Sequence, residues 1–309
     1  MKQINEKRLA VITSVILVLC FAGAAVMGLV TYKGMLATDP EQEYTEQEDN
    51  IIEEEAEKDP VTEPAVIVEY EEEEIVPGIK DFLMAALEPV GKCLYVYGGG
   101  WNEEDTGAGV EAMSYGVSPR WVEFFDEQDN TYNYEEHKYE IHNGLDCTGY
   151  LGYSAYQVFG DKYADDGYVF SSGSVGDNFL RLFGGTLVPN TKVVERKAGD
   201  VMVTKGHVWI VVGECDDGSV LFLQSCPPSV TFSGTPAADG EGNSEAVALA
   251  KKVMKSIAPE AFGRYSKTCK CGMAYVTDYD CYSFPEEVLP DPDGLREMSA
   301  EEVLEELLG

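Results

Sequence analysis

The stretch GLDCTGYLGYSAYQVFG, residues 144–160, decides how the rest of the chain is interpreted. A cysteine lies in it between an aspartate and a Thr-Gly pair, at the point where an apolar helical pattern begins. The apolar face of this pattern is formed by Leu151, Ala155, Val158 and Phe159. Gly160 stands where a helix would end, so we expect a helix over residues 147–159.

Asp146 is placed to cap the expected helix, which puts the Cys147 sulfur in the first turn. Free backbone N–H groups and the helix dipole favour an anion there, so we expect the pKa of the Cys147 thiol to be lowered. A thiolate is a nucleophile if a neighbouring group manages the proton. Taken alone, the pattern leaves three roles open, because Cys147 could be a nucleophile, half of a disulfide or a small buried residue.

Histidine is scarce, since the chain holds only His137, His142 and His207. His207 begins the apolar run HVWIVV directly after the Lys205-Gly206 turn, so we expect it at the end of a strand. A histidine there is usually a solvated surface residue. It is also the best available base, because papain-like sites pair a helix-start cysteine with a histidine on a downstream sheet. His142 and His137 lie in a loop-rich stretch and are weaker candidates.

A third group would hold the other nitrogen of the imidazole. The next expected strand, VLFLQSC at residues 220–226, offers Gln224 and Ser225. The amide oxygen of Gln224 could accept the imidazole N–H, but a shift of one residue in register would bring Ser225 to the same place. The residues themselves leave this choice open.

Four stretches in this order resemble the NlpC/P60 family of cell-wall cysteine peptidases. They are LYVYGGG (94–100), LDCTGY (145–150), AGDVMVTKGHVWIVVG (198–213) and VLFLQS (220–225). The family pattern combines a Tyr-x-Trp/Tyr-Gly-Gly strand, Asp-Cys-Ser-Gly at a helix start, Gly-Asp before a strand turn, and Gly-His-Val. The resemblance covers about residues 78–230. It implies a papain-like α+β fold, with the cysteine helix packed on an antiparallel sheet.

The resemblance also implies roles for the matched residues. Cys147 would be the nucleophile and His207 the base. The third polar residue of the family, a His, Asn or Gln on the following strand, falls on Gln224 and favours it over Ser225.

Three further matches concern the substrate. Tyr95 matches a tyrosine whose hydroxyl supports the active cysteine. Asp146 and Thr148 match positions that help bind the amine end of the substrate, although Thr replaces the usual Ser. We expect neither a metal nor a cofactor.

Two stretches near these motifs carry expectations of their own. The glycine triplet at residues 98–100 lacks the GxGxxG pattern, so we expect a tight turn or a close backbone approach rather than a phosphate loop. Residues 101–145 are too long for a plain loop and should carry short elements or shape the site. Farther on, residues 243–260 predict an amphipathic helix, and Ser299 with Glu302 predicts a capping box.

The amino-terminal part of the chain indicates export. Residues 9–30 carry no charge and are long enough to cross a hydrocarbon layer of ~30 Å as a helix. Lys2, Lys7 and Arg8 precede this segment, so the amino terminus should stay in the cytoplasm. The alternative is a signal peptide cleaved near AGA at residues 22–24. In both cases the remaining chain faces outward.

Charge separates the exported part into regions. Residues 39–76 contain seventeen Asp or Glu against the single Lys58, so this tract should repel itself and stay extended. The 309-residue chain has a formal charge of −34, which disfavours binding to nucleic acid. We predict a cytoplasmic tail (1–8), a transmembrane helix or signal anchor (9–30), an acidic disordered linker (31–76), a catalytic domain (77–285) and a C-terminal tail with a short helix (286–309).

Export also affects the eight cysteines. Cys20 lies in the apolar segment and the other seven follow it, so at least one thiol has no partner within the chain. Cys269 and Cys271 are too close to pair with each other, but one of them could pair with Cys281. These three residues form a poor zinc pattern, because the spacing is irregular and no histidine lies nearby.

Together these observations predict a membrane-anchored, outward-facing cysteine peptidase that cuts peptidoglycan stem peptides. The resemblance suggests the bond between γ-D-glutamate and a diamino acid. Its expected partners are peptidoglycan peptides and the membrane. The alternatives are an amidase or acyltransferase on the same scaffold, and a catalytically silent protein that binds the cell wall.

Overall fold

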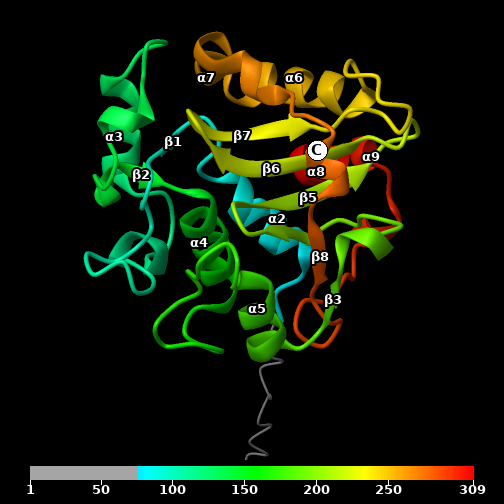
Figure 1. Cartoon of the computed structure of the whole chain (residues 1–309), viewed down its shortest axis with the longest axis horizontal. Coiled ribbons are helices and arrows are strands. Elements are labelled where there is room, and N and C mark those ends of the chain that lie inside the picture. Colours follow the sequence, from blue (N-terminus) through cyan, green and yellow to red (C-terminus); the bar gives the residue numbers. More distant parts are fainter. Residues whose placement is uncertain (1–75) are drawn as a thin grey trace, which may run out of the picture. The chain divides into compact units, whose positions relative to one another are not determined.

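The computed structural model describes residues 76–309 (Figure 1). The α-helices in this range are α2 (Ile79–Leu87), α3 (Pro119–Glu127), α4 (Cys147–Phe159), α5 (Val175–Phe183), α6 (Glu245–Ile257), α7 (Pro259–Tyr265), α8 (Ala274–Thr277) and α9 (Ala300–Leu308). The 3-10 helices are η1 (Val110–Met113), η2 (Tyr134–Glu136), η3 (Ile141–Asn143), η4 (Asn190–Lys192), η5 (Ser266–Cys269) and η6 (Leu295–Glu297). The strands are β1 (Leu94–Tyr95), β2 (Gly144–Leu145), β3 (Thr186–Val188), β4 (Val201–Thr204), β5 (His207–Glu214), β6 (Val220–Cys226), β7 (Ser229–Gly234) and β8 (Asp280–Ser283).

These strands form one eight-stranded sheet in the order β2-β1-β7-β6-β5-β4-β8-β3. The β1–β2 pair is parallel and the other pairs are antiparallel. The predicted α+β class is therefore confirmed, whereas the expected purely antiparallel sheet is wrong at β2. That strand reaches the edge through the long stretch after β1, which allows a parallel return.

The central hairpins follow the turn signals. Thr204 pairs with His207 across the Lys205-Gly206 turn, and a second turn at residues 216–218 joins β5 to β6. His207 is thereby the first residue of β5, as expected for a strand that starts directly after a two-residue turn.

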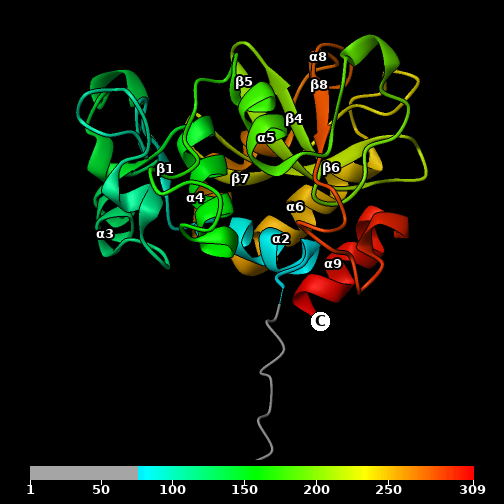
Figure 2. The same cartoon turned by 90° about the horizontal axis from the view of Figure 1, so that it is seen from below.

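Alternation along β5 and β6 gives the sheet two buried faces. One face packs against α2, α4, α6 and α9 and includes Ile210 and Leu223 (Figure 2). The opposite face holds Trp209 and Phe222, with Tyr279 packed on it from the segment after α8. Side chains alternate between the two faces along a strand. Odd-numbered residues of β5 before its bulge and even-numbered residues of β6 therefore lie on the same face as Trp209 and Phe222.

The helix α4 begins and ends where the sequence predicted. The side chain of Asp146 accepts hydrogen bonds from the Thr148 and Gly149 N–H groups, and the chain turns away at Gly160 with a φ of 51°. The helix is buried along most of its length, between α2 and the sheet. Its first turn is therefore fixed by a cap at one end and by packing on its sides.

The long stretch after β1 carries short elements, as expected. It contains η1, α3, η2 and η3, and α3 buries Trp121, Phe124 and Phe125. In Figure 1 this region lies beside α4 at one edge of the fold. It therefore borders the first turn of the cysteine helix.

The two predicted C-terminal helices are also present. Ser244 caps α6 through the Val247 N–H, and Ser299 with Glu302 forms the capping box of α9. Helix α9 packs on β5, where the Gly213 backbone lies against Ala300. Its buried residues join the same core as α2 and α4.

The predicted tail at residues 1–8, the apolar segment at 9–30 and nearly all of the acidic linker lie outside the described residues. Within residues 76–309, every helix is too short or too polar to cross a membrane.

Candidate active site

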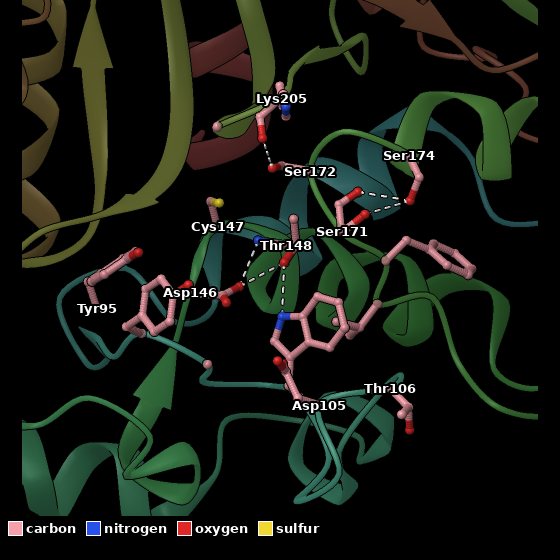
Figure 3. Close-up of a pocket in the computed structure, with 16 residues that line it drawn as sticks. Tyr95, Asp105, Thr106, Asp146, Cys147, Thr148, Ser171, Ser172, Ser174 and Lys205 are labelled. Carbon is pink, nitrogen blue, oxygen red and sulfur yellow. Dashed lines mark hydrogen bonds between the residues drawn. The ribbon is translucent and has the colours of Figure 1, made fainter.

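A cavity of about 620 Å³ opens at the N-terminal end of α4 (Figure 3). Cys147 lies on its wall, between the Lys205 turn and the residues of the long insert. Strand β1 and the loop after it supply Tyr95 and Trp101, and residues 169–174 form another side. Asp105 and Thr106 of the insert line this cavity, so the insert forms part of its wall.

The electrostatic environment of Cys147 differs from the prediction. Burial first, and then the neighbouring Asp146 carboxylate, raise the pKa of the thiol to about 12. Backbone N–H groups at the start of α4 lower the pKa of the thiol, as expected, but they do not offset burial and the Asp146 charge. The prediction of a lowered pKa is therefore wrong: Cys147 is only 9% exposed as a residue, and the helix dipole does not compensate for the lost solvation of the thiol.

The sulfur of Cys147 faces the start of β5. The Val208 N–H, adjacent to His207, lowers the pKa of the thiol. Cys147 also contributes to the raised pKa values of Tyr275 and Tyr279, whose main cause is burial, and both rings lie beside the His207 imidazole. Within residues 76–309 no hydrogen bond joins Cys147 to His207. Such contacts are often loose in a ligand-free site.

The imidazole of His207 is held by the third predicted residue. Its Nε2 lies 2.8 Å from the Gln224 amide oxygen. Burial lowers the pKa of His207 below 6.5, and the bond to Gln224 works in the opposite direction. His207 is therefore a neutral imidazole near pH 7, with one ring nitrogen already engaged.

The register places Gln224 and Ser225 on opposite faces of the sheet. The hydroxyl of Ser225 donates to the Leu145 carbonyl, 2.7 Å away, and does not contact His207. Of the two candidates, Gln224 is therefore the one whose side chain contacts the imidazole.

Asp146 and Thr148 form a connected polar group at the cavity. The Asp146 Oδ1 atom accepts from the Thr148 N–H and hydroxyl at 2.9 Å and from the Gly149 N–H at 2.7 Å. The Thr148 hydroxyl in turn accepts from the Trp101 indole at 3.1 Å. Burial raises the pKa of Asp146 to about 6 despite these bonds. The Thr148 hydroxyl is thus committed to the protein itself.

Tyr95 lines the same cavity. Its ring packs edge-on against Tyr134, with the ring centres 5.4 Å apart. Burial raises the pKa of its hydroxyl, and the nearby Cys147 and Asp146 add to this effect. The hydroxyl is therefore a neutral donor close to the sulfur.

The glycine triplet allows a close backbone approach, as expected. A side chain at Gly149 in α4 would meet the Gly99 carbonyl oxygen at 2.0 Å. Gly100 has a φ of +85°, and a side chain there would meet the Gly149 backbone at 2.6 Å. The loop carrying Trp101 therefore lies directly on the first turn of α4.

The other histidines lie outside this arrangement. His142 contacts Glu111 and His137 contacts Glu140, both on the insert. None of the three histidines is among the residues that line the cavity containing Cys147, and His207 directly follows the lining residues Lys205 and Gly206. His207 alone of the three has a polar partner on the sheet next to α4.

All seven cysteines of the described range are free thiols. The expected pairing of Cys281 with Cys269 or Cys271 is wrong. Cys281 lies on β8 and its sulfur contacts Asp200, whereas Cys271 contacts the Gly234 carbonyl at the end of β7. Three strands separate β8 from β7 in the sheet.

One group in residues 76–309 has the proximity expected of metal ligands. It consists of Cys215, Asp217 and Glu245, with the ligand atoms within 4.8 Å of one another. The two carboxylates already accept backbone N–H bonds from each other's residues. The group lies at the β5–β6 turn, at the opposite end of β5 from His207.

No protein-family model matches this chain, and the searches of curated proteins and of solved structures give no match either. The resemblance to the NlpC/P60 family therefore depends on the four quoted stretches.

Sequence reasoning missed three residues of this site. Trp101 follows the glycine triplet directly, and that position could have indicated its contact with α4. Lys205 was interpreted only as part of a turn, but it lines the cavity. Tyr275 lies in a later segment for which no pattern pointed to the site, and its hydroxyl contacts Gln224.

Proposed function

We propose that this chain is a cysteine peptidase of the NlpC/P60 type, with a papain-like arrangement of Cys147, His207 and Gln224. The observation that supports this most is the 2.8 Å contact between His207 and Gln224. His207 is the first residue of its strand, and the N–H of the next residue, Val208, lowers the pKa of the Cys147 thiol. Cys147 in turn lines the cavity. These contacts support the assignment of Cys147 as nucleophile, His207 as base and Gln224 as orienting group.

The pKa directions define the first chemical step. Cys147 is a neutral thiol and His207 a neutral imidazole near pH 7, so a preformed thiolate–imidazolium pair is not the resting state. The Cys147 proton moves to the free Nδ1 of His207 as the sulfur attacks the substrate carbonyl carbon. The C–S bond forms, and the carbonyl electrons become an oxyanion.

The N-terminus of α4 supplies a donor for this oxyanion. Asp146 accepts from the N–H groups of Thr148 and Gly149, whereas the Cys147 N–H faces its own sulfur and lowers the pKa of the thiol. We assign the oxyanion to that N–H. Protonated His207 then gives its proton to the leaving amine, and water releases the acyl-enzyme.

The lining of the cavity supports a charged peptide as substrate. Asp105 and Asp146 place carboxylates on one side of Cys147, and Lys205 places an ammonium group on another side (Figure 3). A fragment that carries both an amine and a carboxylate suits this distribution, as a peptidoglycan stem peptide does. We propose cleavage between γ-D-glutamate and a diamino acid.

The place of action follows from the amino-terminal pattern. We propose that residues 9–30 anchor the protein in the cell membrane and that the acidic linker extends the peptidase toward the wall. A cleaved signal segment would release the same domain outside the cell.

The test is cleavage of defined muropeptides by the purified full-length chain, with the fragments identified by mass. We expect Cys147→Ala to abolish hydrolysis and to keep the fold. Cys215→Ala is the matched control, because Cys215 lies at the other end of β5 and outside the cavity. Unchanged cleavage by Cys147→Ala would refute the proposal. Release of the stem peptide from its sugar would identify an amidase instead.

A further inference from the structure

The amide of Gln224 is held by residues that follow the stretch resembling the family. Its oxygen faces both the Nε2 atom of His207, at 2.8 Å, and the hydroxyl of Tyr275, at 3.2 Å. Its nitrogen donates to the Ser233 hydroxyl at 2.8 Å. That hydroxyl donates to the Thr268 carbonyl at 2.6 Å. Strand β7, η5 and α8 thus all contribute to one largely buried network.

The last bond in this network fixes the orientation of the amide. The Thr268 carbonyl can only accept, so the Ser233 hydroxyl must use its single proton there. Ser233 then offers only lone pairs to Gln224, and the amide nitrogen must be the group that faces it. The amide oxygen is consequently directed at His207.

The direction of the amide determines which ring nitrogen of His207 carries the proton. The Gln224 oxygen is an acceptor only, so Nε2 must be the donor in the neutral imidazole. Nδ1 then keeps its lone pair, and it has no hydrogen-bond partner among the described residues. A flipped amide would present N–H to Nε2 and would move the proton to Nδ1, which removes the base.

Aromatic rings pack around this contact. Tyr275 lies edge-on to the imidazole with ring centres 5.7 Å apart, and Tyr279 stacks on Tyr275 at 5.3 Å. Tyr279 and Gln224 are almost fully buried. In such surroundings an unpaired polar group is costly, so the network favours one arrangement strongly.

We propose that Ser233, Thr268 and Tyr275 are positioning residues that hold His207 as the Nε2–H tautomer with Nδ1 free. The importance of that tautomer for catalysis rests on the proposed function. The tautomer itself is a property of the free protein and can be measured without any substrate. The segment after α7 is thus assigned a role in the site rather than a purely structural one.

The test is nitrogen NMR of the full-length chain labelled with ¹⁵N-histidine, at a pH where His207 is neutral. Only three histidines contribute signals, and His207→Asn identifies those of His207. We expect the Nε2–H tautomer alone in the unmodified chain. Ser233→Ala leaves the amide free to flip, so a mixture of tautomers should appear.

Ser229→Ala is the matched control, because Ser229 lies buried on the same strand and its hydroxyl has no partner among the described residues. It should leave the tautomer unchanged. Tyr275→Phe keeps the ring and removes one donor, so it should shift the population in the same direction but less. A predominant Nδ1–H tautomer in the unmodified chain, or no change in Ser233→Ala, would overturn the inference.

Activity provides a separate measurement. On muropeptides, Ser233→Ala should lower kcat about tenfold with little change in KM, since a weakened base affects the chemical step. If the tautomers behave as expected but no peptide is cleaved, the positioning role holds and the proposed function fails. If cleavage is found but Ser233→Ala changes neither the tautomer nor kcat, the positioning role fails.

Discussion

Replacing Asp146 by Asn should change how the stability of this protein depends on pH. The hydrogen bonds from Thr148 and Gly149 all use the same oxygen, Oδ1, which an Asn side chain also offers. The Gly98 N–H also lowers the pKa of the carboxyl group. The substitution therefore keeps the cap of α4 and removes the charge.

The expected size follows from the pKa of the carboxyl group. Burial raises it from 3.8 to about 6, so the folded state holds this proton more tightly than the unfolded state does. The stabilisation of the folded state by this bound proton is complete below pH 3.8 and is lost as the pH rises through about 6. At 1.36 kcal/mol per unit, the 2.2-unit difference (6 − 3.8) amounts to about 3 kcal/mol.

The assay is urea unfolding of both proteins at pH 5 and pH 7.5, above the sequence pI of 4.2. About 1.4 kcal/mol of the total should be lost between these two pH values. Asp146→Asn has no carboxyl group at this position and should not show this loss. The difference in free energy of unfolding between the variant and the unmodified chain should therefore be about 1.4 kcal/mol more favourable to the variant at pH 7.5 than at pH 5. A fixed cost of the substitution cancels in this comparison. An equal difference at both pH values, or a gain at the lower pH, would refute the reasoning.

Two other predictions concern the thiol and the packing around it. Alkylation of Cys147 at pH 7 should depend on His207, because a thiol with a pKa of about 12 needs a base to remove its proton. In mass-resolved labelling, His207→Ala should slow the alkylation of Cys147 by on the order of 10²-fold. An unchanged rate would exclude His207 as the base. Gly149→Ala should destabilise the fold by about 3 kcal/mol or more in urea unfolding, because the new methyl group would lie 2.0 Å from the Gly99 oxygen. Gly263→Ala, in α7 with open space around it, is the control and should be neutral or slightly stabilising.

Local patterns in the sequence were sufficient to predict the elements that carry the three proposed catalytic residues. The Asp146 cap and Gly160 define α4, and the Lys205-Gly206 turn defines the start of β5. Each of these signals acts over a few residues, where capping and turn geometry determine the backbone. The same reasoning fails at β2, whose parallel position depends on how a long insert folds.

The pKa of Cys147 shows a different limit of sequence reasoning. A helix start favours a thiolate, and this effect is present in the structure. Its outcome depends on burial, which comes from residues far apart in the sequence: the loop after β1 lies on α4, and β5 lies beside it. A local rule gives the sign of one contribution, whereas tertiary packing determines the sum.

The choice between Gln224 and Ser225 depends both on local strand geometry and on tertiary packing. Alternation along β6 requires the two side chains to lie on opposite faces, but the sequence alone does not say which face holds the imidazole. The structure settles the contact through the register of β6 with its neighbours. The orientation of the amide then depends on Ser233 and on Thr268, 44 residues after Gln224 in the chain (268 − 224). An active histidine needs its tautomer as much as its position, so a motif that ends near residue 230 specifies only part of the base.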